Sequence, residues 1–235
     1  MRERQLKMIL QYSILSVLIL VLLFTSYSFL YKSHELNNLP RKVMNNTQIN
    51  RQNLLNDLDR IYKNIGINEQ SKEGVNNSEF QKLEKELPFK IPQDVQELYK
   101  WHNGVEQFIP AFEFLSLQDA VADYKRMIKF ENEMKNDERF WKDNYLPILQ
   151  FDDSFLVAEC NSRSDTKIYS VWLEGSYTAK EYESIDQMLQ IIVDAYISGA
   201  YYMNYNYLDE NVILLQRVKR KYLSDEQINQ IDLRW

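Results

Sequence analysis

Cysteine and histidine are nearly absent from this chain of 235 residues, which contains one cysteine, Cys160, and two histidines, His34 and His102. A single cysteine cannot form an intrachain disulfide, and these three side chains cannot complete a tetrahedral zinc shell without carboxylates. Glycine and proline number only five each, so the composition is neither collagen-like nor disulfide-rich. We therefore expect an ordinary globular domain without a metal ion or a cofactor.

Catalytic sequence motifs are missing as well. The chain has no Ser-x-Gly elbow, no glycine-rich phosphate loop and no His-Glu-x-x-His zinc motif. Cys160 and His102 could act as a nucleophile and its base, but their spacing does not favour this over a buried cysteine and a core or capping histidine. We expect a binding protein rather than an enzyme.

Basic residues are fewer than acidic ones, 28 against 34, which gives a net charge of −6. The first seven residues hold three of the basic residues and one of the acidic ones, so the remainder has 25 basic and 33 acidic residues and a net charge of −8. Such an acidic surface repels phosphate, which argues against sequence-independent nucleic-acid binding. It suits a basic protein partner, although the charge could equally serve solubility alone.

Charged residues are also absent between Lys7 and Lys32. After a short basic N-terminus over residues 1–8, the 22 residues Ile9–Leu30 are almost all apolar and would extend about 33 Å as a helix, enough for a bilayer core. We predict a single transmembrane helix over residues 9–31. The competing interpretation is a signal peptide cleaved after Ser28, whose apolar core would normally be shorter.

The charges that flank this segment nearly balance. Three basic residues precede it and three follow it within the distance that matters for orientation: Arg2, Arg4 and Lys7 before, and Lys32, Arg41 and Lys42 after. We expect a single-pass protein of the cell membrane. The side on which the soluble domain lies is left open, with a slight preference for the extracytoplasmic side.

Residues 32–76 are predicted to form a linker that contains one amphipathic helix. Gly66 stands where a C-terminal cap belongs, and the apolar residues before it recur at helical spacing: Leu54, Leu55, Leu58, Ile61, Tyr62 and Ile65. This stripe could pack on the domain or on a second copy of the chain; docking on the domain is favoured because the run lasts barely two heptads. We place the domain boundary within residues 67–77 and expect a fragment that starts near Asn76 to fold alone.

Residues 77–205 are predicted to form one α+β domain, an antiparallel sheet wrapped by helices. Capping pairs and a proline predict helix starts at Ser78 with Gln81, at Pro92, at Ser116 with Asp119, and at Ser184 with Gln187. The helix that starts at Pro92 is expected to end at Asn103-Gly104.

Strands are predicted from short β-branched and aromatic segments that turn-forming residues separate. These segments are residues 112–115, 146–151, 155–158 and 168–173. Residues 206–235 are predicted to be a C-terminal helical extension, with a helix over residues 212–222.

Four segments, taken in order, resemble the SUKH superfamily, the group built around SMI/KNR-type regulators of yeast cell-wall assembly. The first runs from Ile91 to Gly104 and ends in Trp-His-Asn-Gly; the others are residues 114–124, 145–148 and 182–202. The residues that carry the resemblance, and to which it gives structural roles, are Pro92, Leu98, Tyr99, Trp101, Asn103, Gly104, Phe114, Leu115, Pro147 and Gly199.

The resemblance implies an α+β fold and binding rather than catalysis. Many bacterial members look like immunity proteins that neutralise secreted toxins, often nucleases, and fungal relatives look like regulators of wall assembly. The chain departs from the family at Asp152-Asp153-Ser154, because the family often has a glycine in this turn and this chain has none. The departure leaves the geometry of the turn open.

Two groups of residues are predicted to bind the partner. Asp152, Asp153 and Glu159 could form an acidic rim for basic side chains, but they could equally be a general acid and base, bind a cation, or form a solvated turn. Tyr201 and Tyr202 are the second group, as interface anchors. They belong to an aromatic cluster that could otherwise be core and sheet edge, together with Tyr196, Tyr205 and Tyr207.

These observations lead to a ranked set of functions. The first is a membrane-anchored immunity protein that neutralises a cognate basic toxin, such as a nuclease, by protein–protein binding. The second is a membrane-tethered interaction module in the regulation of the cell envelope or wall, and a hydrolase ranks last. A toxin gene adjacent to the gene of this chain would separate the first from the second.

Overall fold

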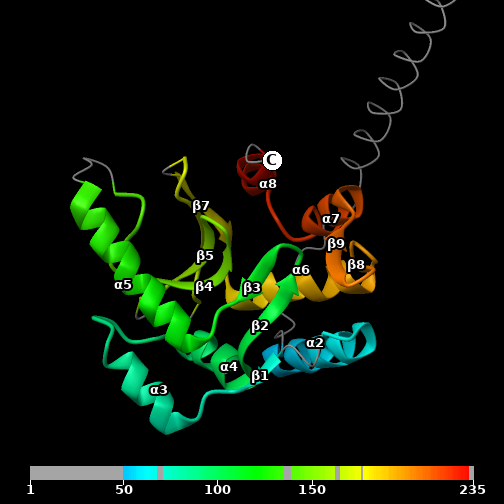
Figure 1. Ribbon diagram of the computed structural model, residues 1–235. Coiled ribbons are helices and arrows are strands. Elements are labelled where there is room, and N and C mark those ends of the chain that lie inside the picture. Colours follow the sequence, from blue (N-terminus) through cyan, green and yellow to red (C-terminus); the bar gives the residue numbers. More distant parts are fainter. Residues whose placement is uncertain (1–49, 68–70, 135–138, 162–164, 176, 233–235) are drawn as a thin grey trace, which may run out of the picture. The chain divides into compact units, whose positions relative to one another are not determined.

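The computed structural model of the chain describes residues 50–67, 71–134, 139–161, 165–175 and 177–232 (Figure 1). All of them belong to one compact unit, Lys42–Trp235. The predicted basic N-terminus and membrane span, and part of the predicted linker, lie outside the described residues. Within the described ranges, no helix has both the length and the hydropathy needed to cross a bilayer.

Seven antiparallel strands form one sheet, in which each strand lies beside the strand that precedes it in the sequence. Its strands are β1 (Ser71–Glu73), β2 (His102–Ile109), β3 (Phe112–Phe114), β4 (Tyr145–Phe151), β5 (Ser154–Glu159), β6 (Ile168–Trp172) and β7 (Tyr177–Tyr182). This meander confirms the predicted α+β class with an antiparallel sheet and helices packed against it.

The two faces of the sheet carry different parts of the core, because successive side chains of a strand point to opposite faces. On β5, Leu156 and Ala158 belong to the main core, whereas Phe155 and Val157 belong to a smaller cluster that includes Met127. Helix α5 (Leu117–Met134) lies on one side of the sheet and contributes Met127 to the smaller cluster and Leu117 and Val121 to the main core, whereas α6 (Ile185–Ile197) lies on the other side and packs into the main core (Figure 1).

The predicted amphipathic helix forms α2 (Arg51–Ile65), which ends at Gly66 with φ 83°. Its side chains Leu55, Leu58 and Tyr62 are buried in the main core, and it runs beside α6 (Figure 1). At the start of α2, Arg51 Nε donates to Asp186 Oδ1 over 2.5 Å. The helix therefore docks on the domain, as expected.

Two helix boundaries differ from the prediction. Helix α3 (Asn77–Glu84) is capped by Asn76, whose side chain accepts a bond from the backbone N–H of Glu79 at 3.0 Å, so the predicted cap Ser78 is wrong. Helix α4 (Gln93–Trp101) follows Pro92 as expected, but it ends before Asn103-Gly104. The reason is that His102 already has the extended angles φ −141° and ψ 143° and begins β2.

The predicted caps Ser116 and Ser184 are confirmed, since each hydroxyl accepts a backbone N–H three residues later at 3.1 Å. The four predicted strands correspond to β3, β4, β5 and β6. Of the strands in this sheet, the sequence patterns missed β1, β2 and β7.

The C-terminal residues pack on the domain. They form the hairpin of β8 (Tyr201–Asn204) and β9 (Tyr207–Glu210), then α7 (Val212–Lys219) and α8 (Asp225–Asp232). Helix α7 ends three residues before the predicted limit, and α8 was not predicted. Both helices and the hairpin add side chains to the main core: Leu208, Leu215, Val218, Leu223 and Ile228.

Candidate functional site

Asp152 and Asp153 form the two-residue turn between β4 and β5, where Phe151 pairs with Ser154. Asp152 has a φ of 48°, in the left-handed region that glycine adopts most easily and that aspartate tolerates better than most residues. The backbone carbonyl of Asp153 accepts the N–H of Leu173 over 3.0 Å and joins this turn to the β6–β7 turn. An aspartate thus occupies the left-handed position of this turn, in which the resemblance led us to expect a glycine.

A row of aromatic side chains crosses the sheet beside this turn. Residues directly opposite in an antiparallel ladder share a face, and the register aligns Phe151 with Ser154, Ser154 with Trp172, and Trp172 with Tyr177. Phe112 extends the row, since its ring lies 5.8 Å from that of Phe151. We call Phe112, Phe151, Trp172 and Tyr177 the aromatic row.

Three of the four members of the aromatic row are open to solvent, although the row lies on the face that α6 covers further along. The exposed fractions are 43% for Phe151, 38% for Trp172 and 37% for Tyr177. Large aromatic side chains that remain exposed together are typical anchors of protein interfaces. This row is therefore the first candidate for a binding surface.

Three exposed carboxylates flank the aromatic row, Asp152 and Asp153 in one turn and Glu174 in the next. None of the three forms an ion pair with another of the described residues. Aromatic faces attract lysine and arginine cations, and carboxylates pair with them. The surface is thus suited to basic side chains of a protein partner.

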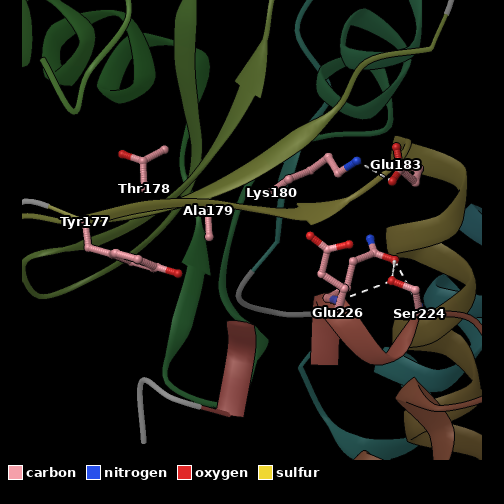
Figure 2. Close-up of a pocket in the computed structure, with 8 residues that line it drawn as sticks. Tyr177, Thr178, Ala179, Lys180, Glu183, Ser224 and Glu226 are labelled. Carbon is pink, nitrogen blue, oxygen red and sulfur yellow. Dashed lines mark hydrogen bonds and ion pairs between the residues drawn. The ribbon is translucent and has the colours of Figure 1, made fainter. Parts of the chain in front are cut away.

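At Tyr177 the row meets a cleft of about 410 Å³ between β7 and α8 (Figure 2). Tyr177 and Ala179 point toward the side of α8, whereas Thr178 points to the opposite face, where its hydroxyl donates to the carbonyl of Phe140 over 2.7 Å (Figure 2). The remaining lining residues are Lys180 and Glu183, which form an ion pair, and Ser224, Glu226 and Gln227. The row and the cleft form one continuous surface.

Glu159 does not join Asp152 and Asp153. It ends β5, whereas the two aspartates precede the same strand, so six residues or roughly 20 Å separate Asp153 from Glu159. Glu159 instead lies 3.3 Å from Lys142 Nζ, an ammonium that sits 5.1 Å from the ring centre of Tyr169. The three predicted acids therefore do not form one rim.

Tyr201 and Tyr202 point in opposite directions because they are neighbours on β8. Tyr201 is buried, its ring meets that of Tyr196 edge to face at 5.3 Å, and burial raises the pKa of its hydroxyl. Tyr202 faces solvent and donates to Asp209 Oδ2 over 3.3 Å. Only the second of the two predicted anchors can therefore meet a partner.

The most exposed aromatic residues of the hairpin were not singled out as partner-binding residues. Tyr205 is 96% exposed and occupies the hairpin turn with a φ of 57°, and Tyr207 is 75% exposed. Strand parity around the turn could have identified them, had the hairpin been predicted. They make the hairpin the second candidate surface.

The Trp-His-Asn-Gly motif joins the start of β2 to two helices. The Oδ1 atom of Asp59 in α2 accepts a hydrogen bond from Trp101 Nε1 over 2.9 Å and lies 3.0 Å from His102 Nε2. Asn103 accepts the backbone N–H of Leu117 over 2.7 Å at the start of α5. Gly104 has a φ of 107°, a conformation that side chains disfavour. These contacts give the motif a structural role.

The other motif residues are structural too. Tyr99 stacks on Phe114 at 5.1 Å, and Pro147 lies beside a bulge in β4, where its missing N–H is tolerated. Gly199 follows α6 with a φ of 72°. The remaining positions are buried or precede α4: Leu98, Leu115 and Pro92.

Cys160 and His102 do not form a catalytic pair. Cys160 is buried, its thiol donates weakly to the carbonyl of Ala158 over 3.6 Å, and burial raises its pKa, which keeps it protonated. The two ring nitrogens of His102 face Asp59 and the carbonyl of Lys72 instead. Among the described residues, no group of three or more His, Cys, Asp or Glu side chains is placed to hold a metal ion.

Comparison with known proteins adds a family match. A model of the SMI1 / KNR4 family (SUKH-1) matches residues 74–191, which is half of the 235 residues. The match begins after α2 and ends within α6. It includes the whole aromatic row, but neither α8 nor the β8–β9 hairpin. No curated protein matches the chain.

Proposed function

The chain belongs to the SMI1/KNR4 (SUKH-1) family, and on that premise we propose that it is an immunity protein that neutralises a toxin by binding it. Members of the family are generally non-catalytic, immunity-type proteins. In our proposal the aromatic row and its carboxylates bind the toxin and block its active surface. One observation carries the proposal: on this fold, exposed aromatic residues stand beside carboxylates that pair with no described cation.

The charge of the chain supports a basic toxin. The net charge is −6, and Asp152, Asp153 and Glu174 add local negative charge at the row. Proteins that act on nucleic acids carry basic surfaces, because they must bind phosphates. A nuclease is therefore the toxin class that we propose.

Aromatic and acidic residues would contribute differently to this binding. Carboxylates at the rim of an interface mainly accelerate association with a basic partner, and salt screens their effect. Aromatic side chains that become buried mainly slow dissociation, and a central one typically contributes about 2 kcal/mol or more. We expect Trp172 to act as the anchor and the aspartates to steer the toxin.

The test uses the toxin encoded beside the gene of this chain and the purified full chain. Trp172→Ala should weaken binding by about 2 kcal/mol, mainly through faster dissociation. The double variant Asp152→Gly, Asp153→Asn removes both charges, and glycine suits the left-handed position of the turn. This variant should slow association with the toxin, most strongly at low salt. Stopped-flow association and surface-plasmon dissociation rates measure the two effects.

Tyr205→Ser is the matched control, since it removes a more exposed aromatic side chain from the other candidate surface. It should leave toxin binding unchanged. If Tyr205→Ser weakens binding and Trp172→Ala does not, the toxin binds the β8–β9 hairpin and the proposal for the aromatic row is wrong.

We further propose that residues 9–31 anchor the protein in the cell membrane, with the domain on the extracytoplasmic side. The support is the sequence alone, 23 residues without charge and of sufficient length. The full chain should stay in membrane pellets after carbonate washing, and protease added to intact cells should remove the domain. A soluble product that begins at Phe29 would contradict the anchor.

A membrane-tethered interaction module in envelope regulation is the alternative function. Its partner would be an envelope component rather than a toxin. The adjacent genes distinguish the two functions, because immunity genes lie next to the toxin that they neutralise. Cells that express the toxin should survive only when this chain is also present. Such survival would support the immunity function.

A further inference from the structure

Strand β7 is one edge of the seven-strand sheet. The strand order ends at β7, and among the described residues only β6 pairs with it. An edge strand presents a row of backbone N–H and C=O groups that can pair with another extended chain. Proteins often cover such an edge, and here a cleft runs beside it instead of a further strand.

The cleft contains a buried amide group without a partner. Gln227 is only 8% exposed, and its side-chain oxygen accepts both the backbone N–H and the hydroxyl of Ser224, at 3.0 and 3.1 Å. Its Nε2 group, in contrast, has no hydrogen-bond partner within the described structure. A buried donor without an acceptor is unfavourable, so an acceptor supplied by a bound molecule would be stabilising.

The charge at the cleft favours a bound molecule that carries a cationic group next to the atom that accepts a hydrogen bond from Gln227 Nε2. Glu183 is already paired with Lys180 at 2.5 Å, whereas Glu226 is exposed and pairs with no cation of the described residues. Figure 2 shows Glu226 on α8, on the side of the cleft that faces Ala179 of β7. A ligand with carbonyl groups along one edge and basic side chains would match both features.

We infer that an extended, basic segment of the partner protein binds along β7 as an eighth strand. The carbonyl of one of its peptide groups accepts Gln227 Nε2, and one of its lysine or arginine side chains pairs with Glu226. A segment in this position reaches the aromatic row through Tyr177, which lines both surfaces. The inference rests on the proposed toxin binding and adds the mode by which the toxin is held.

The first experiment measures backbone hydrogen exchange of the full chain with and without the toxin from the adjacent gene. Strand addition protects the outward N–H groups of β7, so exchange at residues 177–182 should slow by about tenfold or more when the toxin is bound. The amides of β8 and β9 serve as the internal control and should exchange at unchanged rates. Equal rates at β7 in the free and bound protein would overturn the inference.

The second experiment isolates the amide group. Gln227→Glu keeps the oxygen that caps Ser224 and removes the N–H donor, so the fold should be retained and toxin affinity should fall about tenfold. Gln227→Met removes the donor without adding charge and should show the same loss if the glutamate perturbs folding. Unchanged toxin affinity in both variants would contradict the proposed hydrogen bond from Gln227 Nε2 to the toxin.

The two proposals fail in different ways. A toxin that does not bind the wild-type chain contradicts the proposed function. If the toxin binds with an affinity that depends on Trp172 but not on Gln227, and β7 is not protected from exchange, the aromatic row stands as the binding surface. Only the strand addition is then contradicted.

Discussion

The hydroxyl groups of Tyr62 and Tyr196 donate to the same acceptor, the backbone carbonyl of Phe108, each over 2.9 Å. Their rings meet edge to face at 5.7 Å. Burial raises the pKa of both phenols, so both remain protonated donors at neutral pH. One carbonyl of β2 therefore joins α2 to α6, and neither tyrosine lies within the residues that the family model matches.

We expect the two hydrogen bonds to be coupled. Tyr62→Phe or Tyr196→Phe alone should cost about 1 kcal/mol of unfolding free energy, because the carbonyl keeps the other donor. The double variant should cost more than the sum of the two, by on the order of 1 kcal/mol. Urea denaturation of the four proteins gives the double-mutant cycle. Additive losses of unfolding free energy would mean that the two hydrogen bonds are independent of each other.

Removal of α2 should destabilise the domain strongly. A chain that begins at Asn76 lacks the side chains of Leu55, Leu58 and Tyr62, and each buried leucine typically contributes about 2 to 5 kcal/mol. The structure thus argues against the expectation that this fragment folds alone. A chain that begins at Lys42 is the matched control and should unfold cooperatively in differential scanning calorimetry. Equal unfolding temperatures would show that α2 is dispensable.

Gly104→Ala should destabilise the fold by about 1 to 3 kcal/mol, because a side chain at φ 107° is strained. A Cβ at this position would also lie 3.3 Å from the carbonyl oxygen of Phe114. Glu106→Ala, at an exposed position of the same strand, should change stability by less than about 0.5 kcal/mol. Chemical denaturation measures both, and similar values for the two would contradict the backbone argument.

Glu113 should make stability depend on pH in an uncommon direction. Partial desolvation and the nearby charges of Asp119 and Glu106 raise the pKa of its carboxyl in the folded state. The folded state therefore favours the protonated form, and the stability from this group is present below the unfolded pKa and lost as pH rises through the folded pKa. Glu113→Gln should raise the melting temperature at pH 7 and leave it unchanged near pH 3.

Glu86 serves as a control, because its effect on stability should depend on pH in the opposite direction. Its ion pair with Lys125 lowers the pKa of its carboxyl, so its stabilisation is present at neutral pH and lost on acidification. Glu86→Gln should lower the melting temperature at pH 7 and have no effect near pH 3. Thermal denaturation of both variants at the two pH values tests the pair; the same sign for both would contradict it.

Local signals in the sequence predicted those parts of the fold that depend on neighbouring residues. The caps at Ser116 and Ser184 were predicted correctly, because a capping bond spans three residues. Strand β2 was missed because no turn residue separates it from α4: His102 closes the helix and opens the strand. Asn76 was overlooked because Ser78 offers the same chemistry two residues later.

The candidate site depends on contacts that a sequence pattern does not contain. Asp152 and Asp153 could be identified as an exposed turn, but their aromatic neighbour Trp172 is brought beside them only by the register of β5 with β6. The separation of Glu159 follows from the length of β5. The opposite directions of Tyr201 and Tyr202 follow from strand parity, which could be applied only once β8 was known.

The ion pair between Arg51 and Asp186 spans 135 residues, and this has a consequence for biosynthesis. At about 5 to 20 residues per second, a ribosome makes α6 on the order of 10 s after α2. The strands of the meander can meanwhile pair one after another, since each neighbour in the sheet is also the next in sequence. The side of α2 that packs against α6 stays uncovered during that interval, so in a nascent chain this side is accessible to chaperones and proteases.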